Sequence, residues 1–213
     1  MFDIITDSAC DLTPETAATL NIEIIPFYVS LDGEHYRKEG KEIAVRDFYQ
    51  FMVDNPAAYP KTSLPSLEDF ETAFRAHAEA GRPVLCICFT SKMSGCVGSA
   101  RNARELVLED FPDAKIEVID STAATVTESI VVENAVAMRD AGCTLDEAVT
   151  WLEAEKITNR SSSRWVIWTT SSRAGASAKS RAAPPTFWHQ AHDPVQGGRD
   201  LLRWCGPRPP EEL

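Results

Sequence analysis

Hydroxyl-bearing side chains recur where extended segments of this chain are predicted to end. The most informative are Thr62 and Ser63, within Lys61-Thr-Ser-Leu-Pro-Ser66, and Ser94, which precedes Gly95. Neutral hydroxyl donors beside a helix N-terminus suit a carboxylate or phosphate that is bound without a salt bridge. The same residue types also cap helices and turns. For Ser94, at a predicted strand-to-helix turn, we favour contact with an acidic headgroup.

The elements around Ser94 explain why a ligand would bind there. Residues 84–89 are a continuous apolar run, short enough for a strand buried on both faces, and helical spacing begins after Gly95. Two further expected strands end in Asp-Ser, at Asp7-Ser8 and at Asp120-Ser121. Ligands of open parallel sheets bind outside the carboxyl ends of the strands. We expect these polar ends to share one edge with Ser94, although ligand contact and capping are equally supported for Ser8 and Ser121.

The alternation of predicted strands and helices indicates the fold class. Strands are expected over residues 3–8, 22–29, 84–89 and 115–121, and helices from residues 14, 45, 67, 96, 128 and 145. This order predicts an α/β fold with a parallel sheet and helices on both faces. Thr13-Pro14, Ser66 with Asp69, and Thr144 with Glu147 supply expected helix starts.

The character of the chain changes near residue 157. Residues 1–156 carry 13 basic and 28 acidic side chains, whereas residues 157–213 carry 8 and 4. The second segment also contains paired prolines and lacks helical or strand periodicity. We therefore predict one headgroup-binding α/β domain over residues 1–156, followed by an aberrant tail of low order over residues 157–213.

An enzymatic role for Ser94 is the alternative to a binding role. A small α/β acyl hydrolase or transferase would use Ser94 as its nucleophile, but the Gly-x-Ser-x-Gly elbow is absent because Lys92 and Cys96 stand where the glycines are needed. A fluorophosphonate probe directed at serine nucleophiles separates the two possibilities. We favour a protein that is not an enzyme.

The cysteines are not expected to bind metal. Cys86 and Cys88 lie on the predicted strand over residues 84–89, and we expect their side chains to point to opposite faces, which would prevent joint chelation. With four histidines and no Cys-x-x-Cys pair, no metal site is predicted. The cysteines are interpreted as buried, reduced and apolar in behaviour. Asp7 and Asp120 are interpreted as acceptors for loop N–H groups.

Composition excludes several classes of partner. The net charge of −11 over 213 residues argues against nucleic acid and against an anionic membrane surface. No apolar run approaches the ~20 residues that span a bilayer, so stable membrane insertion is not expected. No basic region precedes the first apolar residues, so no signal peptide is predicted and a cytoplasmic location is expected.

Four motifs give the chain a resemblance to a known family. They are Ile4-Ile-Thr-Asp-Ser8, Lys61-Thr-Ser-Leu-Pro-Ser66, Ser91-Lys-Met-Ser-Gly95 with Ser99-Ala100, and Val118-Ile-Asp-Ser121. In this order, over residues 1–156, they resemble the DegV family of fatty-acid-binding proteins. The resemblance implies a carrier without a cofactor that binds a long-chain fatty acid through its carboxylate. It also implies that the carrier presents this fatty acid to a fatty acid kinase.

The resemblance assigns roles to particular residues. Thr62 and Ser94 match the family residues that hydrogen-bond the carboxylate, and we add Ser63, Gly95, Asp7 and Ser8 as expected lipid-binding residues. Three positions depart from the family pattern: Leu64 stands for glutamine, Cys96 for threonine, and Val97 for a residue that is often aromatic.

The larger departure is the tail. The family continues into a second α/β domain with a Gly-Gly-Arg-Ile-Gly-Lys segment, which this chain lacks. Shifted by one base, codons for residues 161–180 permit Ile-Phe-Thr-Val-Gly-Asp-Leu-Asp-Tyr-Leu, two more residues, and then Gly-Gly-Arg-Ile-Gly-Lys-Val. We therefore hypothesise that the second domain is frameshifted or lost. Lipid retention is then expected to be impaired, because one wall of the acyl tunnel is missing, and a non-functional fragment is a further possibility.

Overall fold

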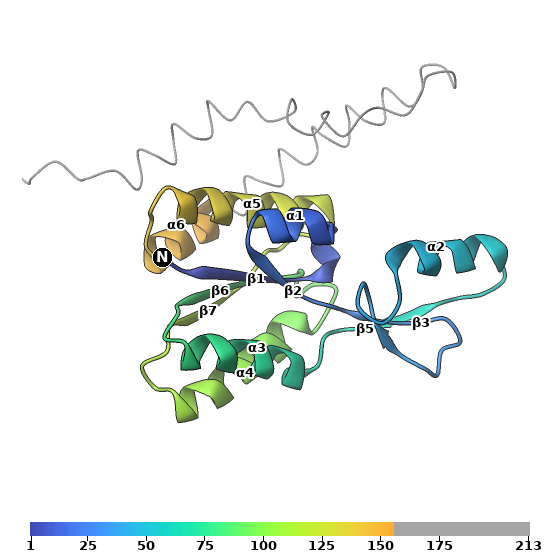
Figure 1. Cartoon of the computed structure of the whole chain (residues 1–213), viewed down its shortest axis with the longest axis horizontal. Helices are drawn as coiled ribbons and strands as arrows, with labels where there is room; N and C mark the ends of the chain where they lie inside the picture. Colours follow the sequence, from blue (N-terminus) through green and yellow to red (C-terminus); the bar gives the residue numbers. More distant parts are fainter. Residues whose placement is uncertain (156–213) are drawn as a thin grey trace, which may run out of the picture.

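A parallel four-stranded sheet forms the centre of the computed structural model, which describes residues 1–155 (Figure 1). The strands are β1 (Asp3–Asp7), β2 (Ile22–Ile25), β6 (Val84–Cys88) and β7 (Ile116–Asp120), in the spatial order β2-β1-β6-β7. All three neighbouring pairs are parallel. Within the described residues, no helix combines the length and apolar character that a membrane span needs.

Helices cover both faces of this sheet, as predicted (Figure 1). One face packs against α1 (Pro14–Thr19), α5 (Val126–Asp140) and α6 (Leu145–Glu155), and the other packs against α3 (Leu67–Glu79) and α4 (Cys96–Asp110). Side chains of β6 alternate between the two cores. Leu85 and Ile87 enter the first core, whereas Val84, Cys86 and Cys88 enter the second. All five are fully buried, so the continuous apolar run is explained by burial on both faces.

The predicted helix starts are confirmed by their hydrogen bonds. The Thr13 hydroxyl accepts the Thr16 N–H, and Pro14 is the first helical residue of α1. Ser66 and Asp69 form a reciprocal capping box at α3. At α6, Thr144 and Glu147 exchange the same pair of bonds. Each cap satisfies N–H groups that a helix otherwise leaves without partners.

A second, antiparallel sheet projects from the main body, and the sequence did not predict it (Figure 1). Its strands are β3 (Tyr28–Ser30), β4 (Arg37–Lys38) and β5 (Lys61–Ser63), in the order β4-β3-β5, and α2 (Val45–Asp54) lies beside it. The single strand expected over residues 22–29 is wrong. Pro26 has no N–H to donate to a ladder, so the chain leaves the first sheet after Ile25 and enters the second at Tyr28.

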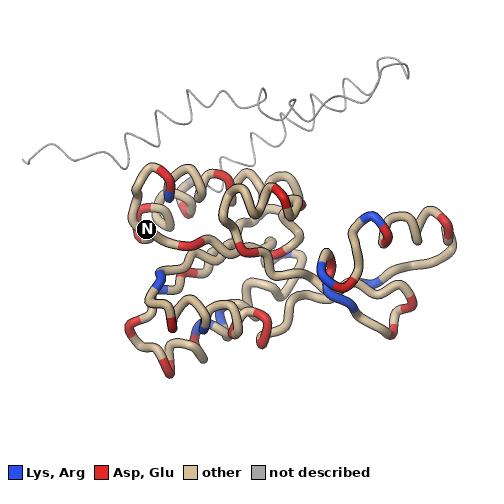
Figure 2. The backbone as a smooth tube through the Cα atoms, in the orientation of Figure 1, with Lys and Arg blue, Asp and Glu red and all other residues tan. Residues whose placement is uncertain are grey.

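Ionic and hydrogen bonds join the small sheet to the main body. Asp69 of α3 accepts the Tyr28 hydroxyl at 2.8 Å and the Lys38 ammonium at 2.6 Å. Basic segments lie where the small sheet meets the main body, and further basic and acidic segments are spread over the described chain (Figure 2). The contacts of Asp69 with Tyr28 and Lys38 fix the small sheet beside the N-terminal end of α3. The short helix η1 (Ser8–Cys10) continues β1 toward this junction.

Candidate functional site at the carboxyl edge of the sheet

The carboxyl ends of β1, β6 and β7 lie at one edge of the sheet, and hydrogen bonds join the segments that follow them. Asp7 accepts the Phe89 N–H at 2.7 Å and the Ala9 N–H at 3.0 Å. Asp120 accepts N–H bonds from Ser91 and Thr122. Both aspartates therefore act as acceptors for loop N–H groups, as the sequence indicated. These hydrogen bonds hold the loops that carry the hydroxyl groups against the carboxyl edge of the sheet.

Ser94 and Gly95 lie at the start of α4. Gly95 is the N-cap residue and has no side chain with which to cap the helix. The first helical hydrogen bond runs from Ser99 to Gly95, at 3.0 Å, so the Val97 and Gly98 N–H groups make no bond within the helix. The Ser94 hydroxyl accepts the Cys96 N–H at 3.2 Å and keeps its own proton for donation. A half-buried hydroxyl at a helix N-terminus is suited to a small anion.

Thr62 and Ser63 lie on β5, at the exposed edge of the small sheet, rather than in a loop. Thr62 pairs with Val29, which also pairs with Arg37, so these three side chains share one face of the sheet. Ser63 pairs with Tyr28 and lies on the opposite face. On the first face, Thr62 and Arg37 lie on the two outer strands, on either side of Val29.

The segment after β5 approaches the start of α4. A Cβ added to Gly95 would lie 3.7 Å from Leu64 Cδ2, and the Ser99 hydroxyl donates to the Pro65 carbonyl at 3.3 Å. Leu64 also packs against the core between the sheet and α4. The β5–α3 connection thus brings the Thr62 segment to the Ser94 turn, although convergence of these two hydroxyls on one ligand stays a prediction.

Asp7 and Ser8 make more hydrogen bonds within the protein than Ser94 does. Asp7 is fully buried, and burial raises the pKa of its carboxyl although hydrogen bonds, the largest of them from Phe89 and Cys96, act in the opposite direction. The Ser8 hydroxyl donates to Glu39 Oε2 at 2.6 Å and accepts the Phe27 N–H at 3.0 Å. Lipid contact by these two residues stays a prediction.

Glu128 of α5 is a residue of this edge that the sequence did not indicate. Its side chain is fully buried, and neither carboxylate oxygen has a hydrogen-bond donor among the described residues. Burial, reinforced by the charge of Asp7, raises the pKa of Glu128 to about 10. The neutral acid form can donate to Asp7, a bond that the ionised form cannot make. A glutamate in the first turn of a helix normally indicates only a favourable dipole interaction.

The expectation for Cys86 and Cys88 is wrong. Residues two apart on a strand point to the same face, and the two sulfurs lie 3.6 Å apart in the core under α4. Cys10, Cys86, Cys88 and Cys96 are free and buried. Burial raises the pKa of Cys86 and holds that of Cys10 at about 12, so these thiols are protonated at neutral pH. Because the two side chains share one face, their orientation no longer argues against joint metal chelation.

The two histidines of the described residues lie away from this edge. His77 is buried on α3 and pairs with Asp3 and Glu23, each at 3.0 Å. His35 pairs with Asp32 in the turn after β3. A cavity of about 520 Å³ also lies elsewhere, at the opposite edge, between Arg82 and Lys115. Ser94 therefore has no neighbouring histidine base in this part of the chain.

Comparison with known proteins gives a consistent family. The model described as "Uncharacterised protein, DegV family" matches residues 1–165. A DegV domain-containing protein of Streptococcus pyogenes serotype M1 is 37% identical over 153 residues, which cover 72% of this chain and 53% of the relative. The chain thus spans about half the length of the curated relatives it matches.

Solved structures give the same fold. A fatty-acid (stearic acid)-binding protein from Eubacterium ventriosum is 45% identical, with a TM-score of 0.70 over 72% of this chain and 53% of that one. A protein from Thermus thermophilus, whose structure concerns fatty acid binding, is 30% identical, with a TM-score of 0.61 over 73% and 53%. The matched parts confirm the α/β fold with its parallel sheet.

Proposed function

This chain belongs to the DegV family, and we propose that it binds a long-chain fatty acid through its carboxylate. The observation that carries the proposal is the Ser94 hydroxyl, which accepts the Cys96 N–H and keeps its own proton for a ligand at the open start of α4. Thr62 is the proposed second donor, brought toward α4 by the β5–α3 connection. Ser63, Gly95, Asp7 and Ser8 are proposed to shape this site.

We propose that exposed apolar side chains of α2 and of Met93 supply one wall for an acyl chain. No residue of α2 is buried, and Tyr49 and Val53 on it are exposed by 58% and 72%. Met93, next to Ser94, is 74% exposed. About a dozen methylenes at about 0.8 kcal/mol each would favour burial of the acyl chain, provided that apolar groups enclose it on both sides. With one wall, we propose weak retention.

We further propose that the chain is a carrier in the cytoplasm, rather than an enzyme, and that its partner is a fatty acid kinase. The absence of a histidine beside Ser94 within residues 1–155 supports binding over acyl hydrolysis. A carboxylate held at the rim by hydroxyl groups, with its acyl chain directed inward, leaves the headgroup accessible to a second protein. The domain proposed for this role comprises residues 1–156.

A fatty-acid titration of the purified chain tests the proposal. Thr62→Val and Ser94→Ala should each weaken saturable binding by roughly 10- to 100-fold, since hydrogen bonds to charged groups contribute about 1.5–3 kcal/mol. Thr150→Ala is the matched control, because its hydroxyl bonds only the Asp146 carbonyl on the surface of α6. The wild-type chain should not react with a fluorophosphonate probe.

Two results would contradict the proposal. Failure of the wild-type chain to bind fatty acid at any accessible concentration would remove the carrier function. Labelling of Ser94 by the fluorophosphonate would instead favour the acyl hydrolase or transferase. Thermal unfolding of each variant separates loss of binding from loss of the fold.

A further inference from the structure

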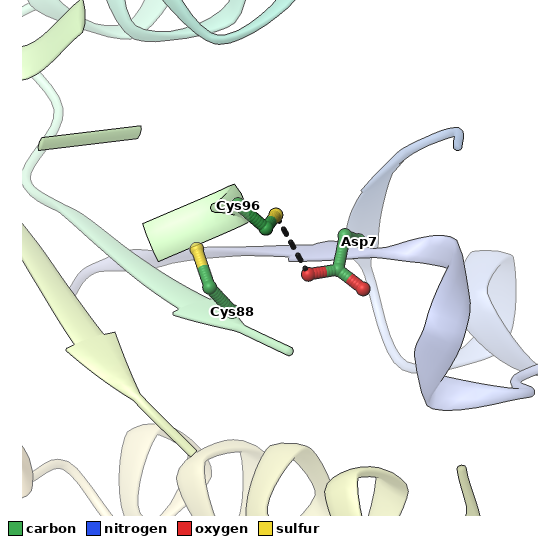
Figure 3. Close-up of side chains that lie close together, drawn as sticks. All are labelled: Asp7, Cys88 and Cys96. Atoms are coloured by element: carbon green, nitrogen blue, oxygen red, sulfur yellow. Dashed lines mark hydrogen bonds between the residues drawn. The ribbon is translucent and has the colours of Figure 1, made fainter. Parts of the chain in front are cut away.

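Three potential metal ligands converge beneath the start of α4. Asp7 ends β1, Cys88 ends β6, and Cys96 begins α4. One carboxylate oxygen and the two sulfurs all lie within 4.8 Å of one another. Figure 3 shows the Cys96 thiol directed at the Asp7 carboxylate, with Cys88 beside them. All three residues are fully buried.

The spacing of these atoms suits a thiophilic divalent cation. Cys96 Sγ lies 3.2 Å from Asp7 Oδ2, a hydrogen bond in the absence of metal. Around a tetrahedral Zn²⁺, with bonds of about 2.3 Å to sulfur and 2.0–2.2 Å to oxygen, neighbouring ligand atoms lie roughly 3.5–3.8 Å apart. Small side-chain rotations therefore convert the present cluster into a ligand set. Cys86 Sγ, 3.6 Å from Cys88 Sγ, is the nearest further sulfur.

The surrounding charge supplies an independent reason for a cation. Glu128 is buried within hydrogen-bonding reach of Asp7, and both of its carboxylate oxygens lack a donor among the described residues. Neither acid has a Lys, Arg or His partner in this part of the chain. Without a positive charge nearby, Glu128 stays in its neutral acid form beside Asp7, and a bound divalent cation would offset the cost of ionising both acids.

We propose that Asp7, Cys88 and Cys96 form a three-ligand site for a thiophilic divalent cation such as Zn²⁺. Binding converts the two thiols to thiolates, and both protons pass to the buffer. The cation would tie β1, β6 and α4 together directly under the Ser94 turn. Its fourth position is left to a further donor, as in zinc sites with three protein ligands. This site shares Asp7 with the proposed fatty-acid site, but its test does not depend on fatty-acid binding.

Cobalt spectroscopy on the full chain tests the site. After treatment with chelator and reductant, titration with Co²⁺ alone should give a thiolate charge-transfer band that saturates at one equivalent, and Zn²⁺ should displace it. Cys88→Ser and Cys96→Thr should each lose the band. Cys10→Ser is the matched control, because Cys10 is also free and buried but lies outside the cluster. It should keep the full band.

Thermal unfolding in chelator shows whether each variant folds, and Zn²⁺ should raise the melting temperature of the wild type and of Cys10→Ser only. Co²⁺ binding without a thiolate band would overturn the site. Equal bands in the wild type and in folded Cys88→Ser or Cys96→Thr would do so as well.

Discussion

At the scale of single residues, Ser8 shows how a residue expected at a ligand can be committed to the fold. Its proton goes to Glu39 and its oxygen accepts the Phe27 N–H, at 2.6 and 3.0 Å. A fatty-acid carboxylate only accepts hydrogen bonds, so Ser8 has no proton for it while the Glu39 bond persists. Ser94 differs because its hydroxyl accepts a bond and retains its proton.

Replacement of Ser8 by alanine should therefore affect stability first. Ser8→Ala leaves the Phe27 N–H and the Glu39 carboxylate without this partner, which should lower the free energy of unfolding by about 1–3 kcal/mol. Urea denaturation followed by circular dichroism measures the change. Thr150→Ala should stay within about 0.5 kcal/mol of the wild type. An unchanged urea midpoint for Ser8→Ala would show that these bonds contribute nothing to the junction.

Gly95 is an expected site residue for which a glycine is not required by the backbone. Its φ is −77°, which any residue adopts, and an added Cβ would meet Leu64 only at ordinary contact distance. Gly95→Ala should therefore leave the free energy of unfolding within about 0.5 kcal/mol of the wild type.

Gly142 provides the contrasting control, since it follows α5 with a φ of 86°. Gly142→Ala should cost about 1 kcal/mol because a side chain is strained in that conformation. The same denaturation experiment compares both variants. A larger loss for Gly95→Ala than for Gly142→Ala would mean that the packing at the α4 start is tighter than described.

At the scale of elements, the sequence predicted those whose burial leaves a periodic pattern. The run over residues 84–89 is apolar because β6 is covered on both faces, and the starts of α1, α3 and α6 carry capping residues. The small sheet leaves no such pattern. Its strand β5 consists of Lys61, Thr62 and Ser63, all exposed, so its pairing with β3 depends on tertiary contacts that a local sequence window does not contain.

The residues of the candidate site were likewise predictable only where a local sequence pattern indicates them. Ser94 and Gly95 were indicated by a strand, a turn and a helix start that are adjacent in the sequence. Glu128 was missed because its burial depends on the packing of α5 against β1 and η1, far away in the chain. The approach of Cys96 to Asp7 likewise joins residues that are 89 positions apart.

Asp69 of α3 connects this helix to the small sheet and so positions the sheet. Burial alone would raise its pKa, but hydrogen bonds from Lys38, Ser66 and Tyr28 outweigh burial and lower the pKa to about 2. Lys38 and Tyr28 belong to the small sheet, and Ser66 caps α3. The orientation of β5, and hence of Thr62, depends on this carboxylate.

The pH dependence of Asp69 has a definite sign. Because its folded pKa is lower than its unfolded value of about 3.9, the stabilisation is fully present above about pH 5 and is lost as the pH falls toward 2. Asp69→Asn should be less stable than the wild type by roughly 1–3 kcal/mol at neutral pH. The difference should shrink on acidification.

Urea denaturation at several pH values between 2 and 7 measures this difference. Glu68→Gln is the control, since the neighbouring Glu68 is exposed and makes none of these bonds. A difference between Asp69→Asn and the wild type that does not change with pH would exclude the carboxylate as its source.

At the scale of the whole molecule, the exposed apolar groups and the partial coverage of the relatives both agree with the frameshift hypothesis. The chain covers about half of the Streptococcus pyogenes relative, and α2 presents Val45, Tyr49 and Val53 to solvent. The predicted tail lies outside the described residues, so the frameshift stays a hypothesis. The family match ends at residue 165, close to residue 161, where the shifted codons would begin to restore the family pattern.

The frameshift hypothesis predicts a gain of function from one base. A gene corrected at that position should encode a second α/β domain, which would cover α2 and close the acyl tunnel. The corrected protein should retain fatty acid through gel filtration, whereas the chain as printed should lose it and aggregate more readily, because its apolar wall stays open to water. Mass spectrometry of lipid extracted from both proteins measures retention.

The headgroup variant makes this comparison specific. In the corrected protein, Ser94→Ala should lower retention while the monomer remains soluble, because the wall is complete and only a donor to the carboxylate is missing. If no single-base change yields the Gly-Gly-Arg-Ile-Gly-Lys segment, the tail has another origin. If the printed chain already retains stoichiometric fatty acid, the acyl chain is enclosed without the second domain, and the expectation of weak retention from a missing wall is wrong.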